Sequence, residues 1–228
     1  MKKNVLITGA TGNLGKATVE KFLNEGYHVI ALATPGRASG IDHKDVSVFE
    51  ADLTDEKQTG AVVGQIIEKY HTIDAALLLV GGFAAGKIEE ADLAQINNMI
   101  TLNFNTAYSV ARPVFVQMKK QSAGRIILVG SKPGLIAENG KDYIGYALSK
   151  SLIFKLAEYL NADGAKHNVV CSVIVPGTID TPANRKSMPN ANFSNWVPPE
   201  EIASAMAFLC ADESRSIREP VIKLFGNS

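Results

Sequence analysis

The feature that most constrains how this chain can fold is a glycine-rich turn close to its start. Residues 8–15, Thr-Gly-Ala-Thr-Gly-Asn-Leu-Gly, join the apolar run Val5-Leu6-Ile7 to a helical pattern over residues 14–24. Glycines at such a junction let the backbone approach a pyrophosphate, and the free N–H groups of the helix then face the anion. The spacing is G-x-x-G-x-x-G rather than the commoner G-x-G-x-x-G, so a tight turn without a ligand is the competing interpretation. The residues expected to hold a nucleotide are Gly9, Thr11, Gly12, Asn13, Leu14 and Gly15.

The same order, a short apolar run followed by a helical pattern, recurs along the 228 residues. The strands are expected at 5–7, 29–32, 46–49, 75–80, 125–129, 169–175 and 221–224. The helices are expected at about 14–24, 55–70, 89–100, 103–121, 143–162 and 199–209. This alternation predicts a Rossmann-type, doubly wound parallel sheet of about seven strands with helices on both faces. No linker divides the chain, so residues 1–228 are expected to form a single domain.

The composition limits the classes of partner that the chain is expected to bind. The 23 basic and 23 acidic residues give zero formal charge, so there is no long-range attraction to nucleic acid or to an anionic membrane. Cys171 and Cys210 lie in apolar stretches, as buried reduced thiols do, and the scattered histidines suggest no metal site. No apolar run approaches the roughly 20 residues that span a bilayer, and no secretion signal begins the chain. We therefore expect a cytoplasmic protein that binds a small molecule.

The end of the second strand bears on the choice of dinucleotide. An NAD site usually places an acidic residue there for the ribose hydroxyls, whereas this strand ends in Ala33. Thr34 and Arg37 follow, and a guanidinium suits a 2′-phosphate. These residues favour NADP(H), with NAD(H) as the alternative and a solvated Arg37 as the competing interpretation.

A tyrosine and a lysine lie four residues apart on one expected helix. Tyr146 and Lys150 share a helix face, and a nearby ammonium lowers the pKa of a phenol. Reduction of a carbonyl needs a proton donor where the alkoxide develops. Such a pair is common by chance, but this one opens the helix that follows a strand ending in Gly130-Ser131. Ser131 can hydrogen-bond a substrate oxygen there.

These residues resemble the short-chain dehydrogenase/reductase family over essentially the whole chain. The resemblance implies that Tyr146 is the acid, that Lys150 binds the nicotinamide ribose and lowers the tyrosine pKa, and that Ser131 orients the substrate. It implies that Asn103 holds a proton-relay water and that Thr181 touches the nicotinamide. The resemblance implies further cofactor-binding residues, which all follow expected strands. These are Asp52, Leu53, Gly81, Gly82, Pro176, Gly177 and Thr178.

Within that family the chain is most similar to the dihydropteridine reductase branch. The stretch 180–196 and the sequence Gly-Gly-Phe-Ala-Ala-Gly at 81–86 carry this similarity. It suggests Phe83 and Trp196 as substrate residues and 182–198 as a substrate lid. That branch generally lacks the active-site serine and carries an acid after its second strand, whereas this chain has Ser131 and Ala33.

The predicted function is NAD(P)H-dependent hydride transfer to a small carbonyl or quinonoid, pterin-like substrate. The alternative is a redox sensor that binds NADP(H) without turning it over, because the glycine turn also resembles that of regulatory members of the wider superfamily. Such sensors usually lack the tyrosine–lysine pair. The family resemblance also implies a homodimer or homotetramer.

Overall fold

The computed structural model describes residues 2–37 and 42–227. Seven strands form one parallel sheet in the order β3-β2-β1-β4-β5-β6-β7, as the alternation predicted. The strands are β1 (Asn4–Thr8), β2 (His28–Ala33), β3 (Val46–Glu50), β4 (Ala75–Leu78), β5 (Gly124–Val129), β6 (Val169–Pro176) and β7 (Val221–Leu224). The strand order reverses between β1 and β4, which is the position where ligands of doubly wound sheets bind.

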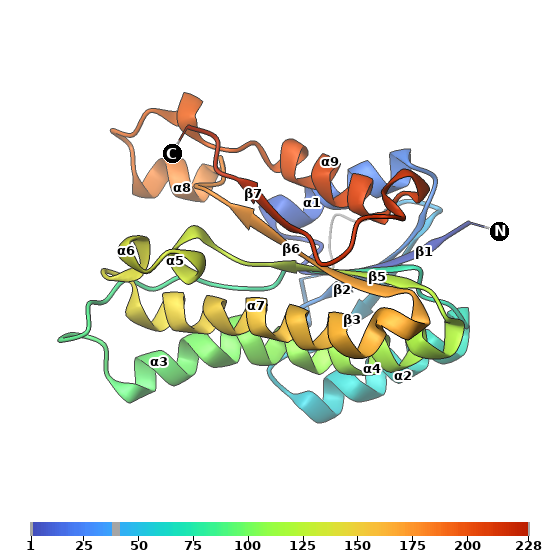
Figure 1. The fold of residues 1–228 in the computed structure, drawn as a ribbon. Helices are drawn as coiled ribbons and strands as arrows, with labels where there is room; N and C mark the ends of the chain where they lie inside the picture. Colours follow the sequence, from blue (N-terminus) through green and yellow to red (C-terminus); the bar gives the residue numbers. More distant parts are fainter. Residues whose placement is uncertain (1, 38–41, 228) are drawn as a thin grey trace.

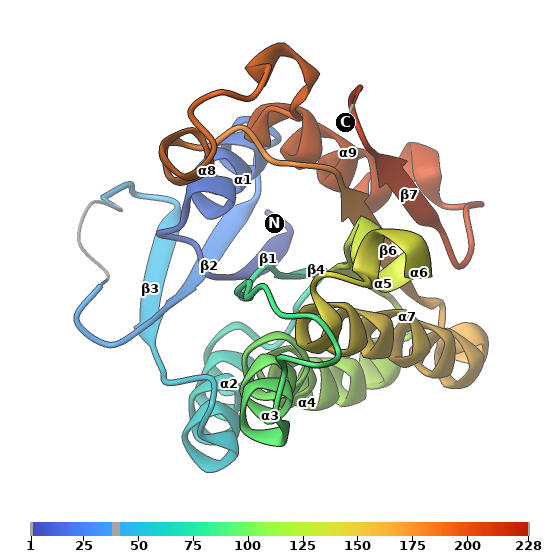
Figure 2. The same ribbon diagram turned by 90° about the vertical axis from the view of Figure 1, so that its left-hand side faces the viewer.

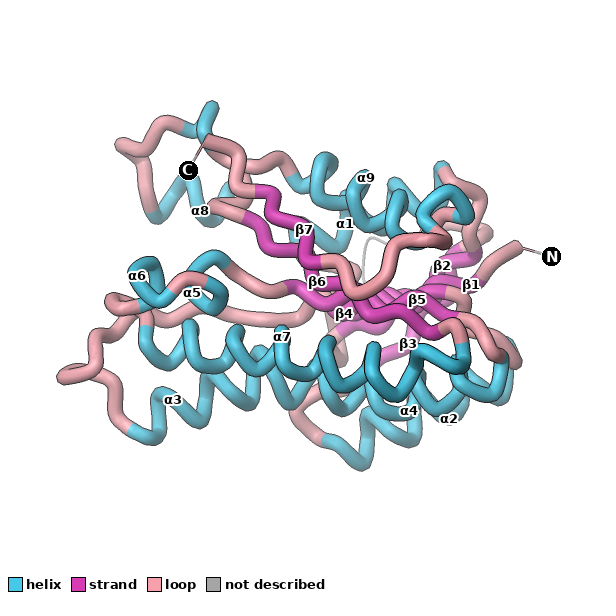
Figure 3. Tube along the Cα trace, viewed as in Figure 1, coloured by secondary structure: helices cyan, strands magenta, loops and turns pink. Residues whose placement is uncertain are grey.

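Helices cover both faces of the sheet (Figure 1). One face carries α1 (Asn13–Asn24) and α9 (Pro199–Cys210). The other carries α2 (Glu56–Tyr70), α4 (Thr106–Gln121) and α7 (Ile144–Gly164), and α3 (Leu93–Ile100) packs against α7. The tube view in Figure 3 shows the resulting three layers, with the strands between two layers of helices.

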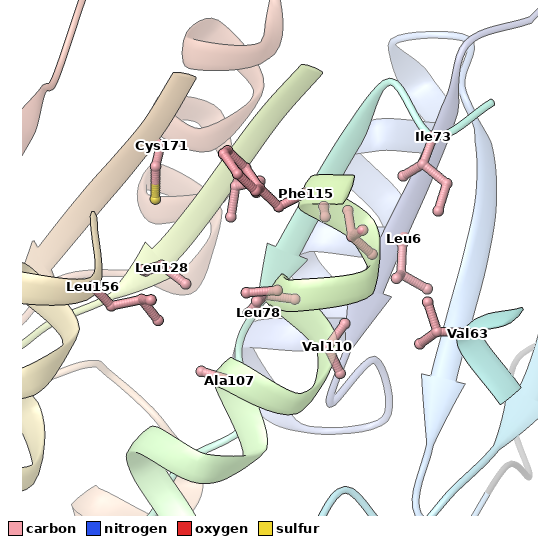
Figure 4. Packing of buried hydrophobic residues seen from close by; sticks show 14 of the residues in the cluster. Leu6, Val63, Ile73, Leu78, Ala107, Val110, Phe115, Leu128, Leu156 and Cys171 are labelled. Carbon is pink, nitrogen blue, oxygen red and sulfur yellow. The ribbon is translucent and has the colours of Figure 1, made fainter. Parts of the chain in front are cut away.

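Each face of the sheet buries its own apolar cluster. On the α4 side, Val110 and Phe115 pack toward Leu78 and Leu128 of the sheet (Figure 4). On the opposite side, Phe22 of α1 is fully buried within the cluster that α9 completes. A side chain of this size contributes about 1.5–3 kcal/mol when it is fully buried. The two clusters hold the strands in register, and so they fix the edge of the sheet where the site residues lie.

The carboxyl ends of the strands point toward three short helices that the apolar periodicity did not predict. These are α5 (Lys132–Leu135), α6 (Ala137–Gly140) and α8 (Pro182–Ser187). Figure 2 looks onto this edge, with β3 at one side of the sheet and β7 at the other. Ser131 begins α5 and Thr181 begins α8, and each side-chain oxygen accepts a hydrogen bond from a backbone N–H of its helix. Both residues are helix caps whose positions are set by the fold.

The break predicted between two helices near residues 101–102 is a change of helical pitch. Residues Thr101–Asn105 form a π-helical turn that joins α3 to α4 without interruption. The Thr106 hydroxyl donates to the carbonyl of Leu102, 2.7 Å away. A π turn moves the side chains that follow it around the helix axis, and such turns are frequent at functional sites. Asn103 lies at its centre.

Over residues 2–37 and 42–227, no helix is both long enough and apolar enough to cross a membrane.

Candidate active site

The glycine turn forms a cradle in which side chains would not fit. Gly9 has a φ of +65°, and a Cβ on Gly15 would lie 2.1 Å from the Gly9 carbonyl oxygen. Gly12 is the N-cap of α1 and offers no side chain to the first N–H groups of that helix. The backbone can therefore approach a phosphate closely, and the amino end of α1 faces the same space. These are features that a bound pyrophosphate requires. Thr11, Asn13 and Leu14 lie in the same turn, at least partly exposed.

Thr8 links the glycine turn to the neighbouring strand, a contact that no local sequence pattern indicates. Its hydroxyl oxygen accepts hydrogen bonds from the N–H groups of Leu79, at 2.9 Å, and Val80, at 3.4 Å. The β1 and β4 ends are thus held together at the point of strand reversal. The Gly9 backbone lies against Val80 in the same place.

The adenosine end of the predicted cofactor site lies beyond β2 and β3. Thr34 and Arg37 are both exposed, on a turn in which the Arg37 N–H donates to the Thr34 carbonyl at 2.9 Å. Asp52 accepts hydrogen bonds from the backbone and the hydroxyl of Thr54, which lower the pKa of its carboxyl. Leu53 is buried next to it. The positions agree with a nucleotide that extends from the glycine turn toward β3.

Tyr146, Ser131 and Lys150 meet at the carboxyl end of β5. Burial raises the pKa of the Tyr146 phenol, and a hydrogen bond with the Ser131 side chain lowers it in part. Lys150 is 6% exposed, and its Nζ donates to the Val129 carbonyl at 2.7 Å. Desolvation lowers the pKa of Lys150 to about 8. The three side chains that the sequence singled out for proton chemistry are therefore brought together, two on α7 and one at the start of α5.

Asn103 connects the loop after β4 to α7. Its Oδ1 accepts from the Gly82 N–H at 2.9 Å, and its Nδ2 donates to the Ser149 hydroxyl at 3.0 Å. Ser149 in turn donates to the Tyr146 carbonyl at 2.8 Å. Both Asn103 and Ser149 are buried. A Cβ on Gly81 would lie 2.7 Å from the Asn103 Oδ1 and 3.3 Å from the Lys150 Nζ, so the glycine is needed there.

Phe83 projects from the same loop beside the tyrosine. Its side chain is 60% exposed, and its ring lies 5.1 Å from the rings of both Tyr143 and Tyr146. The loop is nevertheless fixed, because the Gly86 N–H donates to Asp142 and the Gly86 carbonyl accepts from Ile144. An exposed aromatic ring on an anchored backbone is available to a ligand. Tyr143 was not identified from the sequence, because a lone tyrosine before a helix carries no pattern.

The segment 182–198, which is expected to act as a lid, follows the loop after β6, and Val197 near its end pairs with Ile179 of that loop. The Val197 N–H donates to the Thr178 carbonyl at 2.9 Å, so the end of the segment lies beside that loop. Trp196 is buried at 7% exposure and packs on Phe193, with ring centroids 4.7 Å apart. It therefore contributes to the packing of this segment. Thr181 caps α8 at the inner end.

Known proteins share this architecture and its chain length. A family model described as short chain dehydrogenase matches residues 3–192. A 3-oxoacyl-[acyl-carrier-protein] reductase from Thermotoga maritima is 30% identical, over 98% of this chain and 96% of that protein. A dihydropteridine reductase from Dictyostelium discoideum is 27% identical, over 90% of this chain and 87% of that protein.

An acetoacetyl-CoA reductase from an Acinetobacter strain is 25% identical, over 99% of this chain and 97% of that protein. Among solved structures, ElxO with NADP bound has a TM-score of 0.89 at 25% identity, covering 99% of this chain and 98% of that one. Relatives with acyl-thioester names and a relative with a pterin name thus match at comparable identity. That the dihydropteridine reductase branch is more similar to this chain than other branches stays a prediction.

Proposed function

The chain belongs to the short-chain dehydrogenase family and is an NAD(P)-dependent oxidoreductase, and from that premise we propose that it uses NADP(H) to reduce a small carbonyl or quinonoid, pterin-like compound. One observation carries the proposal: the Tyr146 hydroxyl is hydrogen-bonded to Ser131, and the buried Lys150 lies four residues after Tyr146 on the same helix, α7. A proton donor, a group to orient the substrate and a positive charge then share one end of the sheet.

The residues present fit a dinucleotide. The cradle at Gly9 and Gly15 excludes side chains, and the amino end of α1 carries no side-chain cap. Arg37 is exposed where the second strand ends and would receive the 2′-phosphate, and the relative solved with NADP supports the same choice. When bound, the nicotinamide supplies a hydride. Pro176, Gly177, Thr178 and Thr181 would border that ring.

The proton comes from this chain's own residues. An ordinary phenol is protonated at neutral pH, and burial raises the pKa of Tyr146 further, so Tyr146 holds a proton that it can give to a developing oxyanion. The Lys150 ammonium stabilises the phenolate that remains, since an opposite charge favours the ionised form. Ser131 accepts from Gly134 through its oxygen and has a hydroxyl to offer the substrate oxygen. Asn103 would hold the water that returns the proton.

Phe83 and the segment 182–198 would form the substrate pocket. The exposed Phe83 ring suits a flat, conjugated substrate, because aromatic rings gain about 0.5–1.5 kcal/mol from stacked or edge-on contact. The lid proposal rests on the hydrogen bond that holds Val197 to Thr178 of the preceding loop, and on Trp196, which packs within the segment. A flexible acyl thioester would gain less from an aromatic ring, which favours the quinonoid substrate.

The test is oxidation of NADPH and NADH by the purified protein. The substrate panel contains quinonoid dihydropterin, quinones, aldehydes, ketones and a 3-oxoacyl thioester. We expect turnover with NADPH and the ring compounds. Tight NADPH binding without turnover of any compound would favour the redox-sensor alternative, and turnover of the thioester alone would overturn the substrate proposal.

We also propose that the chain forms a homodimer or homotetramer in the cytoplasm. Tyr108 and Val116 on α4 and Leu152 and Tyr159 on α7 are exposed apolar side chains on neighbouring helices. Apolar groups gathered on one face often mark an interface. Light scattering after gel filtration measures the assembly, and a monomer at micromolar concentration would contradict it. The free, buried Cys171 and Cys210 agree with a reducing compartment.

A further inference from the structure

The acid that is missing from the end of β2 is present on the next strand. Ala33 and Glu50 are paired residues, the last of β2 and of β3 respectively. The Ala51 N–H donates to the Ala33 carbonyl at 3.0 Å, so the pairing continues to the carboxyl edge. Glu50 therefore lies level with the position from which an acidic residue commonly meets the ribose hydroxyls. The sequence alone does not indicate that Ala33 and Glu50 are neighbours, because the two residues are on different strands.

The Glu50 carboxylate reaches the turn that follows β2. Its Oε1 accepts a hydrogen bond from the Gly36 N–H at 3.1 Å. Gly36 has a φ of +74°, and the adjacent Arg37 N–H donates to Thr34 within the same turn. A negative charge is thus placed on the backbone of the turn whose Arg37 side chain is proposed to receive a phosphate. The carboxylate is exposed, so it is available to a ligand.

We propose that Glu50 is a specificity-determining residue that restrains the preference for NADP(H) and allows the site to accept NAD(H). A 2′-phosphate would meet the carboxylate as a like charge and would compete with it for the Gly36 N–H. A free ribose hydroxyl could instead donate to the carboxylate. Arg37 and Glu50 then act in opposite directions on one turn. This inference rests on the proposed cofactor site.

The test measures dissociation constants of NADPH and NADH by nicotinamide fluorescence, without any substrate. Glu50→Gln keeps an acceptor for Gly36 and removes the charge. We expect the variant to bind NADPH roughly three to ten times more tightly than the unmodified protein does, which is the scale of one charge–charge interaction over a few ångströms in a solvated site. We expect it to bind NADH with equal or weaker affinity. Glu68→Gln is the matched control, because Glu68 is an exposed glutamate near the far end of α2.

The outcomes distinguish a failure of the proposal for Glu50 from a failure of the proposed function. If the unmodified protein binds both nucleotides and Glu50→Gln leaves their ratio unchanged, Glu50 has no part in specificity while the proposed function stands. If the unmodified protein binds neither nucleotide, the proposed function fails and this inference fails with it. Glu50→Ser removes the same charge without relying on the glutamine amide, and thermal melting of each variant checks that the fold is retained.

Discussion

The two ends of the proposed site are built differently. Around Tyr146, the polar groups are buried, and Asn103, Ser149 and Lys150 each hydrogen-bond to the backbone or to one another. At the adenosine end, Thr34, Arg37 and Glu50 are exposed, and a hydrogen bond from the Gly36 N–H joins Glu50 to the turn after β2. Breaking a buried hydrogen bond costs about 1–3 kcal/mol when a partner is left unsatisfied, whereas an exposed group can turn to water. We therefore expect substitutions around Tyr146 to cost more stability than substitutions at the adenosine end.

The largest expected effect is at the buried end. Tyr146→Phe removes the proposed acid and keeps the ring that contacts Phe83. We expect turnover to fall by about a hundredfold or more, the scale of losing a general acid, with NADPH affinity nearly unchanged. Steady-state rates and fluorescence titration measure the two quantities. Unchanged turnover would remove Tyr146 from the mechanism and end the contrast between the two regions.

The second expected effect concerns pH. Burial lowers the pKa of Lys150 to about 8, so its ammonium is lost as the pH rises through that value. We expect kcat/KM for reduction to fall by up to about tenfold per pH unit above 8, because kcat/KM reports groups of the free enzyme. Lys150→Met should be slow at every pH and should lack this falling limb. A limb of equal position in Lys150→Met would assign it to another group.

Protein stability should change in the opposite direction over the same pH range. The folded-state pKa of Lys150 lies below the ordinary value of 10.5, so between about pH 8 and 10.5 the unfolded chain binds more protons at this residue. The contribution of Lys150 to the free energy of unfolding therefore rises with pH in that window. Denaturant titrations of the unmodified protein and Lys150→Met at pH 8 and pH 10 measure the difference, which should be absent if Lys150 titrates normally.

The next expected effect is at the exposed end and should be smaller. Arg37→Ala should weaken NADPH binding by roughly tenfold while changing NADH binding little, because only NADPH carries the 2′-phosphate. The measurement is a pair of dissociation constants at fixed ionic strength, since salt screens exposed charges. Thermal melting should be nearly unchanged. Equal losses for both nucleotides would show that Arg37 does not contact the phosphate and that the choice of NADP(H) needs another source.

The same contrast explains what could be predicted from the sequence. The strands lie within a few residues of the expected positions, because alternation of apolar runs and helical patterns is a local signal. The grouping of Tyr146, Ser131 and Lys150 followed from where strands and helices end. The family resemblance singled out Asn103, and the structure shows that its amide, buried on a helix, has Ser149 as a hydrogen-bond partner.

What could not be predicted depends on contacts between distant parts of the chain. Ser149 lies 46 residues from Asn103, and nothing local pairs them. Glu50 meets Gly36 only because β2 and β3 pair in one register, so the sequence showed an absent acid where the structure has one on the neighbouring strand. The apolar spacing predicts a break where the structure has a π-helical turn at Thr101–Asn105, since a change of pitch and an interruption give the same shift in that spacing.

The smallest expected effect tests where substrate preference resides. Phe83→Ala should raise the KM for flat bicyclic substrates by about three- to tenfold, corresponding to the loss of one aromatic contact of about 0.5–1.5 kcal/mol, with kcat less affected. Its anchored backbone should hold, because Gly86 keeps its hydrogen bonds to Asp142 and Ile144. Phe83→Leu is the control for apolar volume without a ring. If both variants behave like the unmodified protein, Phe83 serves only packing with Tyr143, and the segment 182–198 becomes the next place to test for substrate choice.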